Sequence, residues 1–378
     1  MVYDNKEGLS FRTGREYIWK FGSCCSVCMR WRGLAGKSID KIRRAGLLTN
    51  AVFSCSAEDL ERAGISGVIS ARLAAEFNEA WVLKRRSLME ESDVAMVTIL
   101  DDHYPVQLRE TPQPPWVLYY RGRLELASRP SVAMVGTRVP TAYGRKVGEM
   151  LAGQLSAAGL TVVSGLARGI DSVCHEAALG GAGGTIAVVA TGLDKVYPPD
   201  NRELERQISR EGLVLSEYPI GTPSHPGLFP QRNRIIAGLG LGTVVVEADS
   251  RSGSLITADA ALEAGRDVFA VPGPLTSPKS RGALELIKQG AKLVTCASDI
   301  VEEYLSYLPA KGPGAASAGA IERESPADLM EKKLTSEELH LYHILHQGPF
   351  TLDELLASTR WDFWTFAFSS VIFNHKKR

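Results

Sequence analysis

SVAMVGTRVPTAYGRKVGEMLAGQLSAAGLTVVSG, residues 131–165, contains the pattern that decides the fold. Two short runs of apolar, β-branched residues are separated by a segment with the period of an amphipathic helix. Strands that are apolar without polar alternation are typical of a parallel sheet covered by helices on both faces. The alternation continues for roughly 165 residues, and we therefore predict a doubly wound, mostly parallel, Rossmann-like α/β sheet. Its further strands are expected at TIAVVATG, LVLSE, TVVVEAD, DVFAVPG and AKLVT.

The region before this sheet, residues 1–90, contains short charged helical segments separated by glycines. Ser56-x-x-Asp59 has the form of a helix capping box. Gly36-Lys37-Ser38 looks like the end of a P-loop, but Trp31 occupies the position of that motif's first glycine and no strand precedes it. We expect a small helical domain of the SAM or helix-hairpin-helix kind.

The core is expected over residues 91–308. Residues 309–333 are rich in proline, glycine, alanine and serine, which predicts a flexible linker. Residues 334–378 contain two more capping boxes, which begin at Thr335 and Thr351. Two short helices followed by a third segment could form a helix-turn-helix core.

Composition excludes several classes of protein. The formal net charge is zero, so any polyanion must be bound by a local basic patch. The chain has no apolar run near 18 residues, and its first residues are polar, so we expect no membrane span, no signal peptide and a cytoplasmic location. Six cysteines in 378 residues suit reduced thiols. Cys25-x-x-Cys28 lacks the further ligands that zinc requires, so no structural metal is expected.

An unusual pair of arginines occurs in GLFPQRNRIIAGLG, residues 227–240. The apolar run from Ile235 predicts the first turns of a buried helix, which places Arg232 and Arg234 at its entrance. A helix N-terminus already carries partial positive charge, so arginines are disfavoured there. This placement suggests that an anion binds nearby.

The loops at the carboxyl ends of the strands, where ligands bind in doubly wound sheets, support that interpretation. Small hydroxyl-bearing residues and glycines let backbone N–H groups approach an anion, and four of the six loops also carry an arginine or lysine. In an alternative interpretation, Arg138 or Arg168 pairs with an acidic residue, Asp171, Glu217 or Glu247, in a structural network. The loops contain, in chain order, Gly136-Thr137-Arg138; Ser164-Gly165 with Arg168, Gly169 and Asp171; Gly192 with Asp194 and Lys195; Glu217 with the arginine pair; Ser252-Gly253-Ser254 with Thr257; and Pro272-Gly273.

Common enzyme motifs are missing from these loops. The loop after the first strand is G-T-R-V-P-T and not the G-x-G-x-x-G of a dinucleotide site. We find neither a nucleophile elbow nor a metal-binding histidine pair. His103, His175 and His225 are scattered along the chain and are expected to be structural.

Seven segments of the core form a larger pattern: VGTRVPTAYG, SGLARGIDSVCHEAAL, TGLDKVYPPDN, SEYPIG, FPQRNRIIAGL, VVVEADSRSGSLITADAALEAGRDVFAVPG and GALELIKQGAKLV. Together, from about residue 93 to residue 297, they resemble the DNA-processing protein A family (DprA, also called Smf). The resemblance implies an extended Rossmann core that binds single-stranded DNA without hydrolysing it, as a dimer. It also implies protection of incoming DNA during natural transformation and help in loading the RecA recombinase.

The resemblance extends to individual residues. The C-terminal unit is similar to the family's winged helix for two helices and then ends without room for a wing. Pro199 stands where family members often have a lysine. The matched positions are Arg138 in the G-S-R loop, with Thr137 replacing serine; Gly165, Gly169 and Asp171 in S-G-x-A-x-G-I-D; and Arg232, Asn233 and Arg234 in R-N-R.

We therefore predict a protein that binds single-stranded DNA and has no catalytic residue, metal or cofactor. We also predict that Arg138, Arg232 and Arg234 are not required by the core. An alternative is a nucleotide N-glycosidase of the lysine-decarboxylase-like family, although Ser252–Thr257 lacks that family's P-G-G-x-G-T loop; a protein-only adaptor would leave the basic loops unexplained. The predicted DNA-binding residues are Gly136, Thr137, Arg138, Ser164, Gly165, Arg168, Gly169, Asp171, Lys195, Arg232, Asn233, Arg234, Ser252, Gly253 and Ser254.

Overall fold

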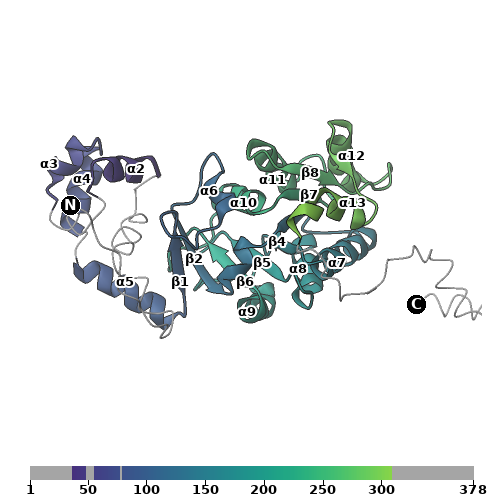
Figure 1. The fold of residues 1–378 in the computed structure, drawn as a ribbon, viewed down its shortest axis with the longest axis horizontal. Coiled ribbons are helices and arrows are strands. Elements are labelled where there is room, and N and C mark those ends of the chain that lie inside the picture. The colour runs from purple at the N-terminus through teal and green to yellow at the C-terminus, as the bar shows by residue number, and fades with distance from the viewer. Residues whose placement is uncertain (1–35, 48–54, 77–78, 309–378) are drawn as a thin grey trace, which may run out of the picture. The chain divides into compact units, whose positions relative to one another are not determined.

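The computed structural model describes residues 36–47, 55–76 and 79–308. Their centre is a nine-stranded sheet with the order β1-β2-β6-β5-β4-β3-β7-β8-β9 (Figure 1). Strand β2 runs antiparallel to both of its neighbours, and every other pair is parallel, which confirms the predicted fold class. The strands are β1 (Ala95–Thr98), β2 (Val117–Gly122), β3 (Ser131–Val135), β4 (Thr161–Ser164), β5 (Thr185–Val189), β6 (Leu213–Ser216), β7 (Gly242–Val245), β8 (Asp267–Ala270) and β9 (Lys292–Leu293).

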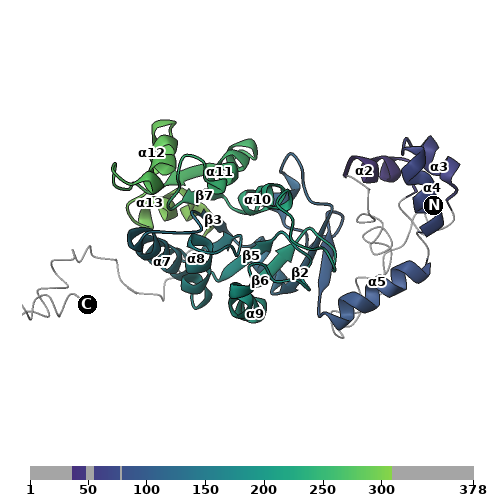
Figure 2. The same ribbon diagram turned by 180° about the vertical axis from the view of Figure 1, so that it is seen from behind.

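Helices cover both faces of the sheet. Figures 1 and 2 show α7, α8 and α9 on one side and α10, α11 and α12 on the other. Every residue of β3 to β7 is buried, as the absence of polar alternation predicts. The helices of the core are α6 (Val106–Arg109), α7 (Ala142–Ala157), α8 (Ile170–Leu179), α9 (Arg202–Glu211), α10 (Leu228–Leu239), α11 (Gly253–Glu263), α12 (Arg281–Lys288) and α13 (Ser298–Val301), with 3-10 helices at Leu124–Ser128, Pro199–Asn201, Pro278–Ser280 and Glu302–Tyr307.

The strand order reverses between β3 and β7. From β3 the chain proceeds outward through β4 and β5 to β6, and it then returns to place β7 on the other side of β3. The loops that follow β3 and β7 therefore lead away in opposite directions, which opens a crevice at the carboxyl edge of the sheet. The candidate site lies at this reversal point.

Helix α10 begins earlier than the sequence pattern indicated. Its first residue is Leu228, so Arg232 and Arg234 lie in its second turn and not at its entrance. Pro230 falls within the first turn, where the backbone N–H that proline lacks would have no partner inside the helix. The helix dipole therefore does not explain why arginines occupy these two positions. The explanation must come from the groups that each arginine contacts.

Among the described residues, the helices that precede the sheet are α2 (Gly36–Arg44), α3 (Ala57–Arg62), α4 (Gly67–Glu76) and α5 (Glu79–Glu91). The predicted capping box is present, with the Ser56 side chain accepting from the Asp59 N–H and the Asp59 carboxylate accepting from the Ser56 N–H. The assignment of residues 1–90 to a SAM-like domain stays a prediction. Within the described ranges, no helix has both the length and the apolar character needed to span a bilayer. Cys25-x-x-Cys28, the predicted linker and the C-terminal unit lie outside the described residues.

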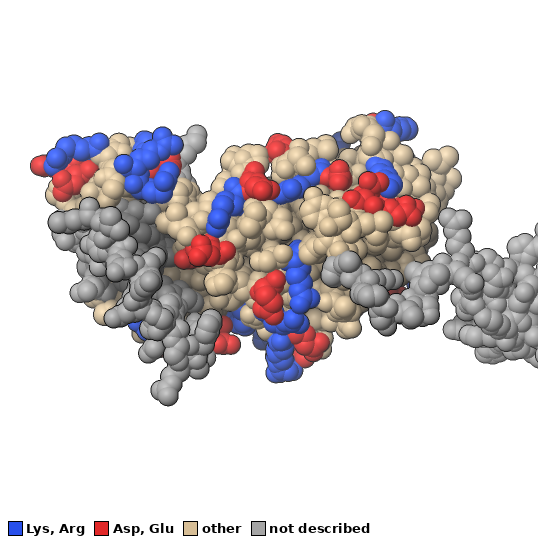
Figure 3. Space-filling model, viewed as in Figure 1, with Lys and Arg blue, Asp and Glu red and all other residues tan. Residues whose placement is uncertain are grey.

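The surface charge of the protein is mixed. On the face shown in Figure 3, blue Lys and Arg side chains are interspersed with red Asp and Glu side chains and do not form one continuous basic field. This distribution agrees with the formal net charge of zero. Binding of a polyanion therefore requires a local arrangement of cations and polar groups.

Candidate nucleic-acid interface

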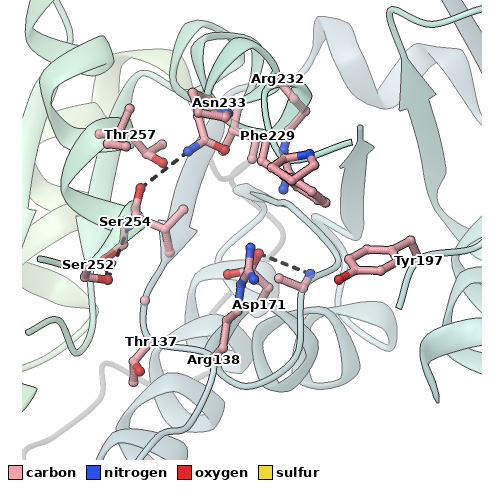
Figure 4. A pocket seen from close by; sticks show the side chains of 18 residues that line it. Thr137, Arg138, Asp171, Tyr197, Phe229, Arg232, Asn233, Ser252, Ser254 and Thr257 are labelled. Atoms are coloured by element: carbon pink, nitrogen blue, oxygen red, sulfur yellow. Dashed lines mark hydrogen bonds between the residues drawn. The ribbon is translucent and has the colours of Figure 1, made fainter. Parts of the chain in front are cut away.

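A pocket of about 590 Å³ opens at the carboxyl edge of the sheet (Figure 4). Loops after β3, β4 and β5, helix α10 and the start of α11 contribute to it. Nine of the predicted residues line this pocket. They are Gly136, Thr137, Arg138, Asp171, Arg232, Asn233, Ser252, Gly253 and Ser254.

Two glycines allow the loops after β3 and β4 to pack directly on each other. Gly169 has φ +86°, and a Cβ at this position would lie 2.4 Å from the carbonyl oxygen of Thr137. A Cβ on Gly136 would lie 2.7 Å from the side chain of Ile170. The N–H of Thr137 donates to the carbonyl of Glu247 at 2.8 Å, which ties the β3 loop to the loop after β7. This close packing holds Arg138 at the edge of the pocket.

Arg138 is exposed, and its guanidinium carbon lies 5.5 Å from the centre of the Phe229 ring. The Tyr197 ring lies 5.5 Å from the Phe229 ring, with 50° between their planes. Among the described residues, no acidic side chain forms an ion pair with Arg138. We call Arg138, Tyr197 and Phe229 the stacking wall. It combines an uncompensated cation with two aromatic faces.

Arg232 has a different environment because it is 4% exposed. Its Nη1 donates to the carbonyl oxygens of Gly165 at 2.6 Å and Val188 at 2.5 Å. Burial lowers the pKa of Arg232 to about 10, while the nearby Asp171 carboxylate acts in the opposite direction. Arg232 therefore joins the β4 loop to the end of β5. The prediction that the core does not require Arg232 is wrong.

Arg234 points away from the pocket. Its Nη2 lies 2.7 Å from Oε2 of Glu217, and its Nη1 donates to the carbonyl of Gln113 at 2.7 Å. The side chain is 26% exposed. Arg234 therefore forms a structural ion pair with Glu217, which argues against the prediction that the core does not require it.

The other predicted basic residues are exposed and lie near carboxylates. Arg168 pairs with Asp200 at 2.6 Å, and Lys195 lies 3.5 Å from Asp194. Neither arrangement involves the acidic partners that the alternative interpretation named. Exposed pairs of this kind are weak, so a phosphate can compete for either cation.

Asp171 is a buried carboxylate in the wall of a pocket that is otherwise suited to anions. It accepts from the N–H groups of Gly165 at 3.2 Å and Ala167 at 3.3 Å. Burial raises the pKa of Asp171, and the neighbouring Arg232 guanidinium opposes that shift. Its partners indicate that it orders the β4 loop.

The opposite side of the pocket carries hydroxyl and amide groups, which we call the hydroxyl wall: Asn233, Ser252, Ser254 and Thr257 (Figure 4). Ser252 caps helix α11 and accepts from the Ser254 N–H at 3.3 Å. Asn233 donates to the Gly253 carbonyl at 3.4 Å. Space around Gly253 is open, because a Cβ there would meet nothing within 4 Å. The start of α11 thus presents small polar groups to the pocket.

The remaining predicted residues lie around this pocket. Gly165 and Arg168 line a smaller neighbouring cavity of about 30 Å³, which shares Arg138 and Arg232 with the main pocket. Ser164, Gly169, Lys195 and Arg234 line neither cavity. Tyr197, Phe229 and Thr257 line the main pocket but were not among the predicted residues. A usable signal for the two aromatics was their position directly before a proline, Tyr197 in a loop and Phe229 in the first turn of α10, where exposed rings are candidates for base stacking.

Comparison with known proteins adds a family match. Residues 95–305 match the model of a family described as DNA recombination-mediator protein A. The DNA processing protein DprA of Streptococcus pneumoniae is 49% identical over 207 residues, which cover 55% of this chain and 73% of that protein. A putative DNA processing protein DprA of Mycobacterium tuberculosis is 42% identical over 279 residues, which cover 70% of this chain and 69% of that protein.

Two solved structures share the fold. The X-ray structure of DprA from Streptococcus pneumoniae has a TM-score of 0.64 and 39% identity, and the match covers 76% of this chain and 96% of that one. DNA processing protein A from Helicobacter pylori has a TM-score of 0.52 and 31% identity, and the match covers 58% of this chain and 99% of that one. The Helicobacter pylori protein is described as having a unique single-stranded DNA binding mode.

Proposed function

The chain belongs to the DNA recombination-mediator protein A family, and on that premise we propose that its pocket binds single-stranded DNA with little preference for base. We assign phosphate or base contacts to the stacking wall and the hydroxyl wall. Arg232, Asp171, Gly165 and Gly169 keep the loops in position. Gly136, Thr137 and Gly253 also line the pocket, and we assign contacts with the strand outside it to the exposed cations Arg168 and Lys195. Ser164 and Arg234 have structural partners and are not assigned to the DNA.

The observation that carries the proposal is the stacking wall. Single-stranded DNA offers a phosphate and an aromatic base in every nucleotide, and proteins that bind it combine cations with aromatic platforms. Arg138 supplies a cation without an acidic partner among the described residues, beside the Phe229 ring, which in turn lies next to the ring of Tyr197. Stacking on a ring is tolerant of base identity, because every base has a π-face.

The hydroxyl wall supplies neutral donors for a second phosphate. The first N–H groups of a helix have no partner inside it, and the helix dipole favours a negative group at this end. Gly253 allows a phosphate to approach the backbone closely. This local arrangement supports binding of a polyanion by a protein whose formal net charge is zero.

The same arrangement favours single strands over duplexes. Base faces are stacked on one another in a duplex and are not available to Phe229 or Tyr197. An unpaired strand can turn a base into the pocket at a smaller cost.

Titration of a labelled oligo-dT and of a matched duplex, followed by fluorescence anisotropy, tests the proposal. We expect the single strand to bind more tightly and its affinity to fall steeply with salt, since phosphate contacts release counterions. Equal affinity for the two forms, or binding to neither, would reject the proposal.

The proposed function requires no catalysis. The glycosidase alternative requires a carboxylate that is free to act on a nucleotide. Asp171, the acidic residue that lines the pocket in the described part of the chain, is engaged by two backbone N–H groups. The comparisons also favour a recombination mediator over a glycosidase. Incubation with nucleoside monophosphates should release no free base; measurable release would revive the alternative.

Membership of the family also supports proposals about partners. We propose that the chain acts as a homodimer, protects incoming DNA in natural transformation and helps to load the RecA recombinase. Sedimentation at tens of micromolar should give a dimer, and DNA-bound protein should shorten the delay before RecA filaments form. A monomer, or an unchanged delay, would remove the corresponding proposal.

A further inference from the structure

Three chain segments meet beside the pocket: the loop after β3, the loop after β7 and the start of α12. The Lys279 ammonium donates to the carbonyl of Val139, which is the residue after Arg138. The N–H of Gly282 donates to the carbonyl of Ala248 at 2.9 Å. The start of α12 therefore contacts both the β3 loop and the β7 loop, which contribute Arg138 and Ser252 to opposite walls of the pocket.

The surface made by these segments is basic and partly apolar. Arg251 and Arg281 are exposed, and Lys279 is half-buried. Within the described ranges, none of the three forms an ion pair with an acidic side chain. Val139 is 69% exposed, and Leu275, in the loop before α12, is 84% exposed. We call these five residues the outer rim.

We propose that the outer rim is a second contact surface for the same DNA strand, and that it receives the nucleotides that extend beyond the pocket. The proposal rests on the proposed function. Cations without acidic partners complement the continuing phosphate backbone, and the exposed apolar side chains offer contacts to unstacked bases. Arg138 and Val139 are adjacent in the chain, so the rim is continuous with the pocket.

The charge pattern of the outer rim favours a DNA strand over a protein as its partner. Exposed lysine and arginine on many surfaces are paired with acidic neighbours, as Lys288 is with Glu285 farther along α12. The rim has three basic residues and no ion pair within the described part of the chain. A strand held in the pocket must continue past one of its edges, and this edge supplies the complementary charge.

The experiment compares two double variants that lose the same charge. Arg251→Ala with Arg281→Ala alters the rim. Arg210→Ala with Lys288→Ala serves as the control and removes two exposed cations. These two residues lie in the last turns of α9 and α12, and both turns are at the amino edge of the sheet, away from the pocket. Each protein is titrated with oligo-dT of about 5 and about 20 nucleotides at several salt concentrations.

We expect the rim variant to bind the long oligonucleotide several-fold more weakly, with a salt slope lower by about 1.4, or ~0.7 for each lost phosphate contact. Its affinity for the short oligonucleotide should match that of the unaltered protein. The control variant should bind both normally, and both variants should melt normally because the altered side chains are exposed.

An equal loss for both lengths, or the same loss in the control variant, would contradict the inference while leaving DNA binding by the pocket intact. Unchanged binding of the long oligonucleotide would assign the rim to another occupant and would also overturn the inference. If the unaltered protein binds neither length, the proposed function fails and the inference fails with it.

Discussion

Nη1 of Arg232 lies 2.6 Å from the carbonyl oxygen of Gly165, and a Cβ on residue 165 would lie 2.0 Å from the same nitrogen. The guanidinium therefore occupies the space that any side chain at residue 165 would need. Because Arg232 is buried and also bonds the Val188 carbonyl, it cannot move aside without losing both hydrogen bonds. The glycine and the arginine form one structural unit in the wall of the smaller cavity beside the pocket.

Replacement of Arg232 with alanine should lower the free energy of unfolding by about 3 kcal/mol or more, because Asp171 would remain buried without its neighbouring cation. Urea denaturation measures the change. Gly165→Ala should also be destabilising, since it displaces the same guanidinium. Unchanged stability in Arg232→Ala would contradict the role assigned here.

Replacement of Arg234 with alanine should reduce stability by about 1–2 kcal/mol, because the ion pair with Glu217 is largely shielded from solvent. A double-mutant cycle with Glu217→Gln measures the coupling between the two side chains. DNA affinity should change little, since Arg234 does not line the pocket. A large loss of affinity with normal stability would instead support the phosphate contact that the sequence suggested.

Replacement of Phe229 with alanine should weaken binding of oligo-dT by about 1–3 kcal/mol, the usual contribution of one stacked base. The salt slope should stay the same, because no charge is removed. Phe229→Tyr keeps an aromatic face and should bind nearly normally. If the alanine variant loses salt dependence together with affinity, the ring acts mainly by holding Arg138.

Stability should depend on pH through His175. Burial lowers the pKa of His175 to about 3, and its Nδ1 lies 2.7 Å from Oγ1 of Thr185. The unfolded chain takes up this proton near pH 6.5, whereas the folded chain does not until about pH 3. The contribution of neutral His175 to the free energy of unfolding is therefore fully present above about pH 6.5. It decreases as the pH is lowered, by about 2 kcal/mol at pH 5.

Unfolding of the intact protein and of His175→Gln at several pH values isolates this contribution. The variant should lose less stability between pH 7 and pH 5. If the free energy of unfolding changes with pH in the same way in both proteins, groups other than His175 cause the pH dependence.

Local patterns in the sequence were sufficient for most of the sheet. Strands β3 to β9 each fall within a short, mostly apolar run of the sequence, and each was predicted. Strands β1 and β2 were missed because they pair antiparallel outside the strand–helix repeat, so the alternation that identified the others does not extend to them. The convergence of the loops also followed from the sequence, since parallel strands place their carboxyl ends on one edge.

The roles of the arginines could not be predicted in the same way. Arg138, Arg232 and Arg234 all occupy loop or helix positions at the same edge of the sheet. Only the packing of the folded chain shows that their roles differ. Arg138 lies exposed beside Phe229, Arg232 is buried against Gly165, and Arg234 pairs with Glu217. Burial and pairing depend on residues distant in sequence, which local pattern does not reveal.

The most direct test of the account is a salt titration of oligo-dT binding by Arg138→Ala. Arg138 is exposed and has no acidic partner among the described residues, so its removal should leave the melting temperature unchanged. We predict weaker binding at low salt and a salt slope reduced by about 0.7, the value for one phosphate contact with a single strand. Unchanged affinity and slope in a normally folded variant would contradict the assignment of the pocket to single-stranded DNA.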